Sequence, residues 1–453
     1  MNSNYRRQVV LLLAIAFTIR LAAGWVWQSN LEGRFVFGDS ESYWSLGRAI
    51  ASGEPYRFGN AESRVFRTPG YPLLLAPLFL IGGPETPPVW GRVLGACFGT
   101  LSVLGVWWLA RRLFGPEAGR LAGAAAALYP EAVAGSILVL GEAPFCPLML
   151  ANLALWIAAW QSDSPRRAFW TACAAGATAG AATLVRPSWL LFLPFAIAAG
   201  LILERATGWA EDESLNTGGA SARRGGPLWL GAAMFLGLVV VMAPWWIRNA
   251  AVIGHFVPTS LEVGASLADG LGPQATGASD MAFVDRVIEQ ERLEPNSPAV
   301  PFEVQLDRRM REDALDWAWR HPGRVIRLAS VKFVRMWNIW PNEASFSAWP
   351  VRLVVMLTYV PVVLLGILGA AKTIRQGWPY WLCWFPAIYF TLLHVVFVSS
   401  IRYRQPAMLA LIVFGILVEH FGSYAFFYST ITASAAIGCV LASLRLKPPK
   451  DAQ

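Results

Sequence analysis

The stretch VVLLLAIAFTIRLAAGWVW, residues 9–27, decides the class of fold. It is almost wholly apolar, with Arg20 as its one charge, and it is long enough to cross a ~30 Å hydrocarbon core as a helix. It is too long to be only the apolar region of a signal peptide, and no small-residue cleavage site follows it. We therefore expect this segment to remain as a membrane anchor.

The composition extends this conclusion to the whole chain. Hydrophobic residues make up 55% of the 453 residues and charged residues only 15%, and the mean hydropathy is +0.45. These values are typical of an integral membrane protein. The sequence predicts an all-α polytopic fold with about eleven spans, at residues 9–27, 89–109, 120–139, 143–160, 169–185, 188–203, 228–247, 351–371, 379–398, 408–421 and 424–444.

Residues 71–81 form an apolar segment that is too short for a span. Pro69 and Pro72 precede or open it, and Gly82, Gly83 and Pro84 follow it. We expect a re-entrant or interfacial helix here.

The distribution of basic residues predicts the orientation. With a cytoplasmic N-terminus, five basic clusters fall on the cytoplasmic side, as the positive-inside rule requires. These clusters are Arg6 with Arg7, Arg111 with Arg112, Arg166 with Arg167, Arg205 with Arg223 and Arg224, and Lys372 with Arg375. We expect a multi-pass protein of the inner (plasma) membrane, although an odd number of spans places the basic tail 445–450 outside.

This topology divides the chain into three parts. Residues 1–247 form an N-terminal transmembrane module that includes a first outer loop, 28–88. Residues 248–350 form an extracytoplasmic subdomain, and residues 351–453 form the C-terminal transmembrane helices. Within the subdomain, basic residues of 324–337 gather on one side of a helical wheel, so we expect a helix lying on the outer interface.

Several function classes lack their motifs. No phosphate-binding glycine loop and no H-E-x-x-H pair occurs, which leaves nucleotide hydrolysis and zinc proteolysis unsupported. The net charge of +8 is mostly explained by topology, so we expect no nucleic-acid partner. The five cysteines all fall in predicted spans without a C-x-x-C pair and are interpreted as packing residues. Small-x-x-x-small spacing, at Gly95 with Gly99 and Gly176 with Gly180, predicts close helix packing.

Acidic residues at the outer ends of the spans are the first candidates for chemistry. Asp39 and Glu41 lie in GDSESY, residues 38–43, just after the first span. Two adjacent carboxylates at the mouth of a membrane protein contribute little to stability and suit catalysis. For Asp39 the alternative is an ordinary N-cap of a helix that opens there. Glu142 lies at the junction of the third and fourth predicted spans, where it either serves the site or snorkels or caps a helix.

Five short motifs in a fixed order carry a resemblance to a known family. They are GDSESY (38–43), RTPGYPLLL (67–75), RRLFG (111–115), PWWIRN (244–249) and IRYRQP (401–406). Together they resemble the GT-C superfamily of integral membrane glycosyltransferases. The similarity is to the bacterial branch related to protein O-mannosyltransferases and lipid A aminoarabinose transferases, and it runs over nearly the whole chain.

The resemblance implies transfer of a sugar from a polyprenyl-phosphate donor to a lipid, glycan or protein acceptor on the outer face, by inverting single displacement. It assigns Asp39 as general base, Glu41 as its partner in a D-x-E pair, and Glu142 as a further acid near the site. In some branches the acidic pair contacts a divalent ion, but we assign no metal ligands here. The lipid bilayer and the donor lipid are the expected partners.

The same resemblance assigns basic and aromatic residues to the donor. Arg402 and Arg404 match the basic pair near the donor phosphate, and Arg67 occupies the place of a third basic residue. The planar guanidinium suits bidentate phosphate binding. Tyr43 and Tyr403 are candidates for contact with the substrate. The alternative for these Arg and Tyr residues is anchoring at the membrane interface.

Two other arginines at the outer side, Arg186 and Arg248, are interpreted as ordinary boundary residues. A lipid-linked sugar flippase is the main rival function, and it predicts charges inside the spans and repeated halves. Arg20 is the one clear mid-span charge. A structural or sensor protein without catalysis is the third alternative.

Overall fold

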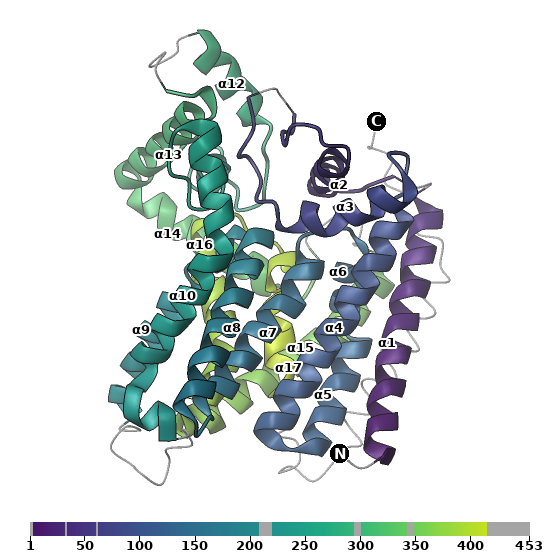
Figure 1. Cartoon of the computed structure of the whole chain (residues 1–453). Coiled ribbons are helices and arrows are strands. Elements are labelled where there is room, and N and C mark those ends of the chain that lie inside the picture. Colours follow the sequence, from purple (N-terminus) through teal and green to yellow (C-terminus); the bar gives the residue numbers. More distant parts are fainter. Residues whose placement is uncertain are drawn as a thin grey trace.

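The computed structural model describes residues 3–31, 34–59, 62–207, 220–293, 300–341 and 348–414, and these are helical or irregular with no strand. Eight of the described helices are long and apolar enough to cross a membrane. They are α1 (Ser3–Asn30), α4 (Val89–Phe114), α7 (Glu142–Trp160), α8 (Pro165–Val185), η1 with α9 (Pro187–Thr207), α10 (Ala220–Ile253), α15 with η3 (Trp349–Gln376) and α16 (Trp378–Val396). They stand side by side as a bundle, with the N-terminus at its lower end (Figure 1). The predicted all-α polytopic fold is confirmed.

The predicted third span, 120–139, is wrong as a single helix. The chain forms α5 (Pro116–Leu128) and α6 (Pro130–Ile137), separated by Tyr129 in an extended conformation. Pro130 causes the break, because proline has no N–H to donate and disfavours helical geometry in the residue before it. The end of α5 therefore leaves carbonyl groups without helical partners.

Arg20 of α1 satisfies these carbonyl groups. Its side chain is 1% exposed, and its guanidinium donates to the carbonyl oxygens of Ala126 and Ala127, each at 3.1 Å. Its Nε donates to Ser136 Oγ at 3.3 Å. Arg20, the mid-span charge that the flippase alternative predicts, is thus hydrogen-bonded within the protein.

Half of the predicted span 408–421 and the whole of the last predicted span lie outside the described residues. The helix α17 (Gln405–Ile412) begins within the IRYRQP motif and includes the start of the predicted span 408–421. The predicted span 424–444 lies outside the described residues, as does Cys439. The other four cysteines are not in disulfides.

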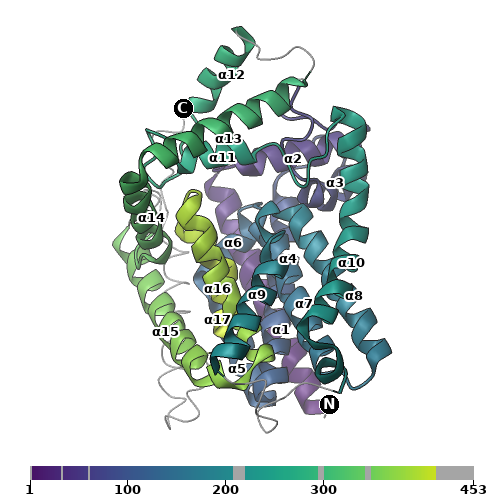
Figure 2. The ribbon, with the colours of Figure 1, turned by 90° about the vertical axis from the view of Figure 1, so that its left-hand side faces the viewer.

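A second layer of helices lies over the upper end of the bundle. It contains α2 (Gly38–Ala51) and α3 (Gly70–Gly82), with α11 (Val263–Gly270), α12 (Phe283–Leu293) and α13 (Phe302–Arg320). Figure 2 shows these helices above the bundle, with α14 (Pro322–Trp337) at its side. The short helix α3 carries the apolar segment that we expected to be interfacial or re-entrant, and its length is below that of the spans.

Lys332 departs from the predicted basic side of α14. It is fully buried, and its Nζ donates to the carbonyl oxygens of Gly270 and Val396 at 2.8 and 2.5 Å. Burial lowers the pKa of Lys332 to about 8. This lysine therefore joins α14 to the ends of α11 and α16, while Ile326 and Val334 remain exposed.

The glycine pairs pack where helices approach closely, as predicted. An added Cβ at Gly176 of α8 would lie 1.7 Å from the carbonyl oxygen of Met234 in α10. At Gly95 of α4 it would lie 1.9 Å from the carbonyl oxygen of Ser136 in α6. Both neighbours are backbone atoms, so the helices themselves would have to move.

We expect Gly176→Ala to lower the thermal unfolding midpoint of the protein in detergent, because overpacking of this kind costs roughly 1–3 kcal/mol. Gly323→Ala is the matched control, since nothing lies within 4 Å of its added Cβ. An equal midpoint for the two variants would contradict the close approach of α8 and α10.

Candidate functional site

A cavity of about 1660 Å³ lies between the bundle and the helices above it. Part of its wall is charged and polar, which we call the polar end, and part is apolar, which we call the apolar arm. The polar end is lined by Asp39, Glu41, Tyr43, Arg67, Glu142, Arg186, Glu262, Arg402 and Tyr403. The apolar arm is lined by side chains of α1, α6 and α15, including Ile19, Ala22, Val26, Val133, Ala134, Val351, Val354 and Val355. The cavity thus joins a charged chamber to a hydrocarbon-like channel.

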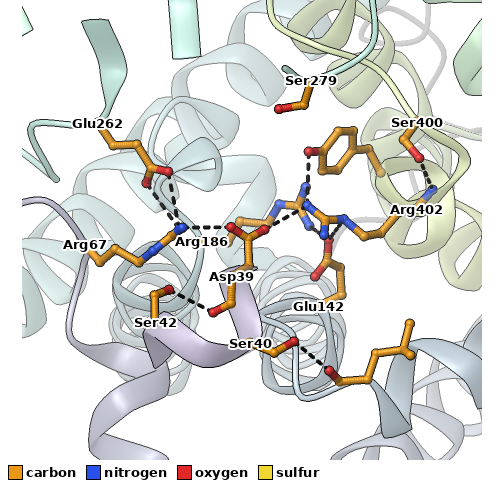
Figure 3. Close-up of polar contacts among 12 residues, drawn as sticks. Asp39, Ser40, Ser42, Arg67, Glu142, Arg186, Glu262, Ser279, Ser400 and Arg402 are labelled. Atoms are coloured by element: carbon orange, nitrogen blue, oxygen red, sulfur yellow. Dashed lines mark hydrogen bonds and ion pairs between the residues drawn. The ribbon is translucent and has the colours of Figure 1, made fainter. Parts of the chain in front are cut away.

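Six charged side chains at the polar end alternate in sign and touch in sequence (Figure 3). In order they are Glu262, Arg67, Asp39, Arg402, Glu142 and Arg186. We call them the charge chain. They come from six separate places in the sequence, and their formal charges sum to zero.

Asp39 lies in the middle of the charge chain. Its Oδ1 accepts from Arg67 Nη2 at 2.7 Å and its Oδ2 accepts from Arg402 Nη2 at 3.1 Å. Burial would raise the pKa of Asp39, but the guanidinium groups of Arg67 and Arg402 outweigh it and lower that pKa below its usual value. Asp39 is therefore held as a carboxylate.

The start of α2 directs Asp39 into the cavity. The N-cap of α2 is Phe37, no side chain caps it, and Asp39 is in the first turn. Ser40 Oγ donates to the carbonyl oxygen of Leu138 at 2.9 Å, which fixes this turn against the end of α6. The alternative of Asp39 as an ordinary N-cap is therefore wrong.

Glu142 joins two arginines. It is the first residue of α7 and is 4% exposed. Its Oε1 lies 2.9 Å from Arg186 Nη1 and 3.1 Å from Arg402 Nε. The carboxylate therefore neither snorkels nor caps a helix, but orients two guanidinium groups beside each other.

Two members of the charge chain were missed or misjudged from the sequence. Glu262, in the loop before α11, has both carboxylate oxygens 3.3 Å from Arg67 Nη1, and burial raises its pKa. No motif surrounds it. Arg186, interpreted as a boundary residue, instead contacts Glu142. Arg248 does stay outside the cavity, and it donates to the carbonyl oxygen of Arg64 at 2.8 Å.

The two tyrosines lie on the cavity wall. The Arg67 guanidinium lies 5.0 Å from the ring centre of Tyr43, and burial raises the pKa of this phenol to about 12. Tyr403 stacks on His394 with ring centres 4.3 Å apart, and its hydroxyl accepts from Arg402 Nη2 at 3.1 Å. Both side chains present polar and aromatic surface to a ligand.

Glu41 and Arg404 lie apart from the charge chain. Glu41 lines the cavity but is exposed and makes no ion pair within the described residues. Arg404 is fully buried, pairs with Glu131 and lies against the ring of Tyr359, and it does not line the cavity. The 3₁₀ turn η4 (Ile401–Arg404) explains the divergence, because residues two apart in such a turn point in different directions.

The described ranges contain no group of three or more His, Cys, Asp or Glu side chains that could hold a metal ion. Asp39 has a guanidinium on each oxygen and does not converge with Glu41. The residues of this arrangement therefore do not fit the divalent ion that the resemblance admitted.

The fold defines a class, that of polytopic all-α membrane proteins with a second layer of helices over the bundle, and comparisons with known proteins find similar folds. The family model for dolichyl-phosphate-mannose-protein mannosyltransferase matches residues 67–220. The Archaeoglobus fulgidus oligosaccharyltransferase in its apo form has a TM-score of 0.60 at 14% identity, over 98% of this chain and 57% of that chain. The fold of this chain is therefore similar to that of the archaeal oligosaccharyltransferase, and the family model matches about a third of the chain.

Two further structures are similar. The oligosaccharyltransferase AglB from Archaeoglobus fulgidus, in complex with an inhibitory peptide and a dolichol-phosphate, has a TM-score of 0.58 at 12% identity, over 99% of this chain and 57% of that chain. ArnT from Cupriavidus metallidurans, bound to undecaprenyl phosphate, has a TM-score of 0.43 at 18% identity, over 91% and 77%. The chain thus spans a little over half the length of the archaeal enzyme. No curated protein matches the sequence.

We expect Arg186→Gln to destabilise the protein by roughly 1–3 kcal/mol, because it removes one of two cations from the buried carboxylate of Glu142. Adding Glu142→Gln to the same chain should recover part of this loss. Thermal unfolding of the two single variants and the double variant measures the coupling. Strictly additive effects would show that the pair is not coupled.

Glu303 of α13 fixes the loop that leads to Arg67. Its carboxylate accepts from the backbone N–H groups of Arg64 and Val65 at 2.9 and 3.0 Å. Burial outweighs these contacts and raises the pKa of Glu303 to about 7. Helix α13 therefore anchors the segment before Arg67 through a group that titrates near neutrality.

Between about pH 4.5 and 7 the folded protein retains the Glu303 proton that the unfolded chain loses. We therefore expect stability from this group to decrease as the pH rises through this window. Thermal unfolding midpoints measured across the window should show a shallower decline in Glu303→Gln than in the unaltered chain. Parallel pH profiles would contradict this assignment.

Proposed function

We propose that this protein is a glycosyltransferase that moves a sugar from a polyprenyl-phosphate-linked donor to an acceptor on the extracytoplasmic face. One observation carries the proposal. A carboxylate, Asp39, lies between two guanidinium groups at the polar end of a cavity whose other end is apolar. This combination suits a ligand with an anionic head, a sugar and a hydrocarbon tail.

Arg402 and Arg186 are the proposed donor-phosphate ligands. Glu142 holds both guanidinium groups beside each other, and the planar guanidinium binds phosphate oxygens in pairs. The apolar arm between α1, α6 and α15 would hold the polyprenyl tail, which gains free energy by leaving contact with water. The dolichol-phosphate in the similar AglB structure supports a lipid-phosphate ligand. Arg404 is excluded from this set by its position.

The proposed reaction is a single displacement. A nucleophilic group of the acceptor attacks the anomeric carbon, and the bond from that carbon to the phosphate oxygen breaks on the opposite face, so the configuration inverts. Asp39 takes the acceptor proton, and Arg402 and Arg186 stabilise the departing lipid phosphate. The activated donor bond supplies the free energy, so no nucleotide site is needed.

The remaining residues of the polar end suit the sugar and the acceptor. Tyr43 offers a neutral aromatic surface beside Arg67. Glu262 and Arg186 are the two ends of the charge chain. An acceptor near Glu262 would therefore approach the sugar from the side opposite to the phosphate. Glu41 also lines the cavity. We propose contact of these three side chains with the sugar or the acceptor.

The proposed side of the membrane follows from the topology. The site lies at the end of the bundle opposite to the N-terminus (Figure 1). Arg111 and Arg112 end α4 at the N-terminal side of the bundle. With that side cytoplasmic, the cavity is extracytoplasmic.

We expect Asp39→Asn to reduce sugar transfer roughly 10²- to 10⁴-fold, because the amide cannot accept the acceptor proton. The assay uses reconstituted vesicles and a panel of radiolabelled polyprenyl-phosphate sugars, with a membrane extract as the source of acceptor. Asp316→Asn is the matched control, because Asp316 is exposed on α13 outside the cavity. Movement of lipid-linked sugar across the vesicle without product, regardless of Asp39, would support the flippase alternative instead.

A further inference from the structure

Every side chain that a donor phosphate would use is already engaged. Arg402 Nη2 lies 3.1 Å from both Asp39 Oδ2 and the Tyr403 hydroxyl, and its Nε lies 3.1 Å from Glu142 Oε1. Arg67 Nη2 holds the other oxygen of Asp39 at 2.7 Å. A lipid phosphate must therefore compete with a carboxylate for Arg402.

The charge chain is also electrically balanced. Three carboxylates and three guanidinium groups sum to zero, so an arriving phosphate makes the site anionic unless a carboxylate takes a proton. The phosphate must also share Arg402 with the carboxylates that already contact it. Two carboxylates contact Arg402, namely Asp39 and Glu142. The effect of the donor on the site depends on which of these two carboxylates loses its contact with Arg402.

Loss of the contact with Arg402 costs less free energy for Asp39 than for Glu142. Its side chain is 35% exposed, and after losing Arg402 it still has Arg67 at 2.7 Å. The side chain of Glu142 is only 5% exposed, and Arg402 is one of its two cations. Removing a cation from a buried carboxylate costs more free energy than removing one from a partly exposed carboxylate, because water cannot reach the buried group to replace the cation.

We propose that the donor phosphate displaces Asp39 from Arg402, and that this exchange converts Asp39 into a competent proton acceptor. This inference rests on the proposed function. Before the exchange both oxygens of Asp39 are bound by guanidinium groups, which makes the carboxylate a weak base. After the exchange Oδ2 has lost its cation and lies beside the sugar that the phosphate carries.

The exchange fixes the order of the reaction. An acceptor that arrives first finds Asp39 neutralised by two cations, whereas an acceptor that arrives after the donor finds a more basic carboxylate. The Tyr403 hydroxyl and Glu142 hold Arg402 in place while its partner changes. The donor therefore acts as the activator of its own reaction.

Binding of undecaprenyl phosphate to the purified full chain in detergent tests the exchange without any acceptor. The titration follows intrinsic tryptophan fluorescence, since Trp27 lines the apolar arm. Because Asp39 competes for Arg402, we expect Asp39→Asn to bind undecaprenyl phosphate roughly 3- to 10-fold more tightly than the unaltered chain. Asp39→Ala, which has no side-chain acceptor left, should bind at least as tightly as Asp39→Asn.

Asp285→Asn is the matched control, because it removes the same charge from the cavity lining at a residue outside the charge chain. We expect its affinity for undecaprenyl phosphate to stay within about twofold of the unaltered chain. Arg402→Gln should bind at least about tenfold more weakly. Size-exclusion profiles and thermal unfolding midpoints check that each variant is folded.

The outcomes separate the two proposals. Unchanged or weaker binding in both Asp39 variants would overturn the exchange, while loss of binding in Arg402→Gln would still support the proposed function. Equal tightening in Asp285→Asn and Asp39→Asn would also overturn it, because net charge alone would then explain the gain. Failure of the unaltered chain to bind undecaprenyl phosphate would instead reject the proposed function, and the exchange with it.

Discussion

The rest of the site depends on the pairing of buried carboxylates with guanidinium groups. A charge removed from water is costly unless an opposite charge and hydrogen bonds replace the water. The chain meets this requirement with an alternating series that ties α2, α7 and η4 to the loops before α3 and α11 and after α8. The contacts that offset the cost of burying these charges therefore also hold the second layer of helices in place over the bundle, around one cavity.

The helices below the charge chain explain why one cavity has two characters. The chain breaks between α5 and α6, and Arg20 satisfies the carbonyl groups that the break exposes. With those polar groups satisfied, the walls nearby are apolar side chains such as Ala22, Val133 and Val354. Charged and apolar surfaces thus adjoin in the wall of one cavity.

Local patterns and the family resemblance singled out residues that the structure brings together. Asp39, Arg67, Glu142 and Arg402 each lie in a short motif next to an apolar segment, and all four meet in the structure. Arg404 was predicted from the same motif as Arg402, but the 3₁₀ turn points it toward Glu131. Glu262 has no sequence signal, because its role comes from a contact with Arg67, which lies far from it in the chain.

The sequence by itself determined the membrane class, eight of the predicted spans and the close approach of helices at glycine, because hydropathy and residue size act over short stretches. Only the tertiary structure decided which charges pair, that Arg186 and Glu262 join the site, and that Arg404 and Glu41 lie apart. Pairing depends on contacts between six segments that are far apart in the sequence. The sequence does not show whether a given arginine is buried or exposed. The physical reason is that the free energy of a charge is set by its surroundings, which the fold alone supplies.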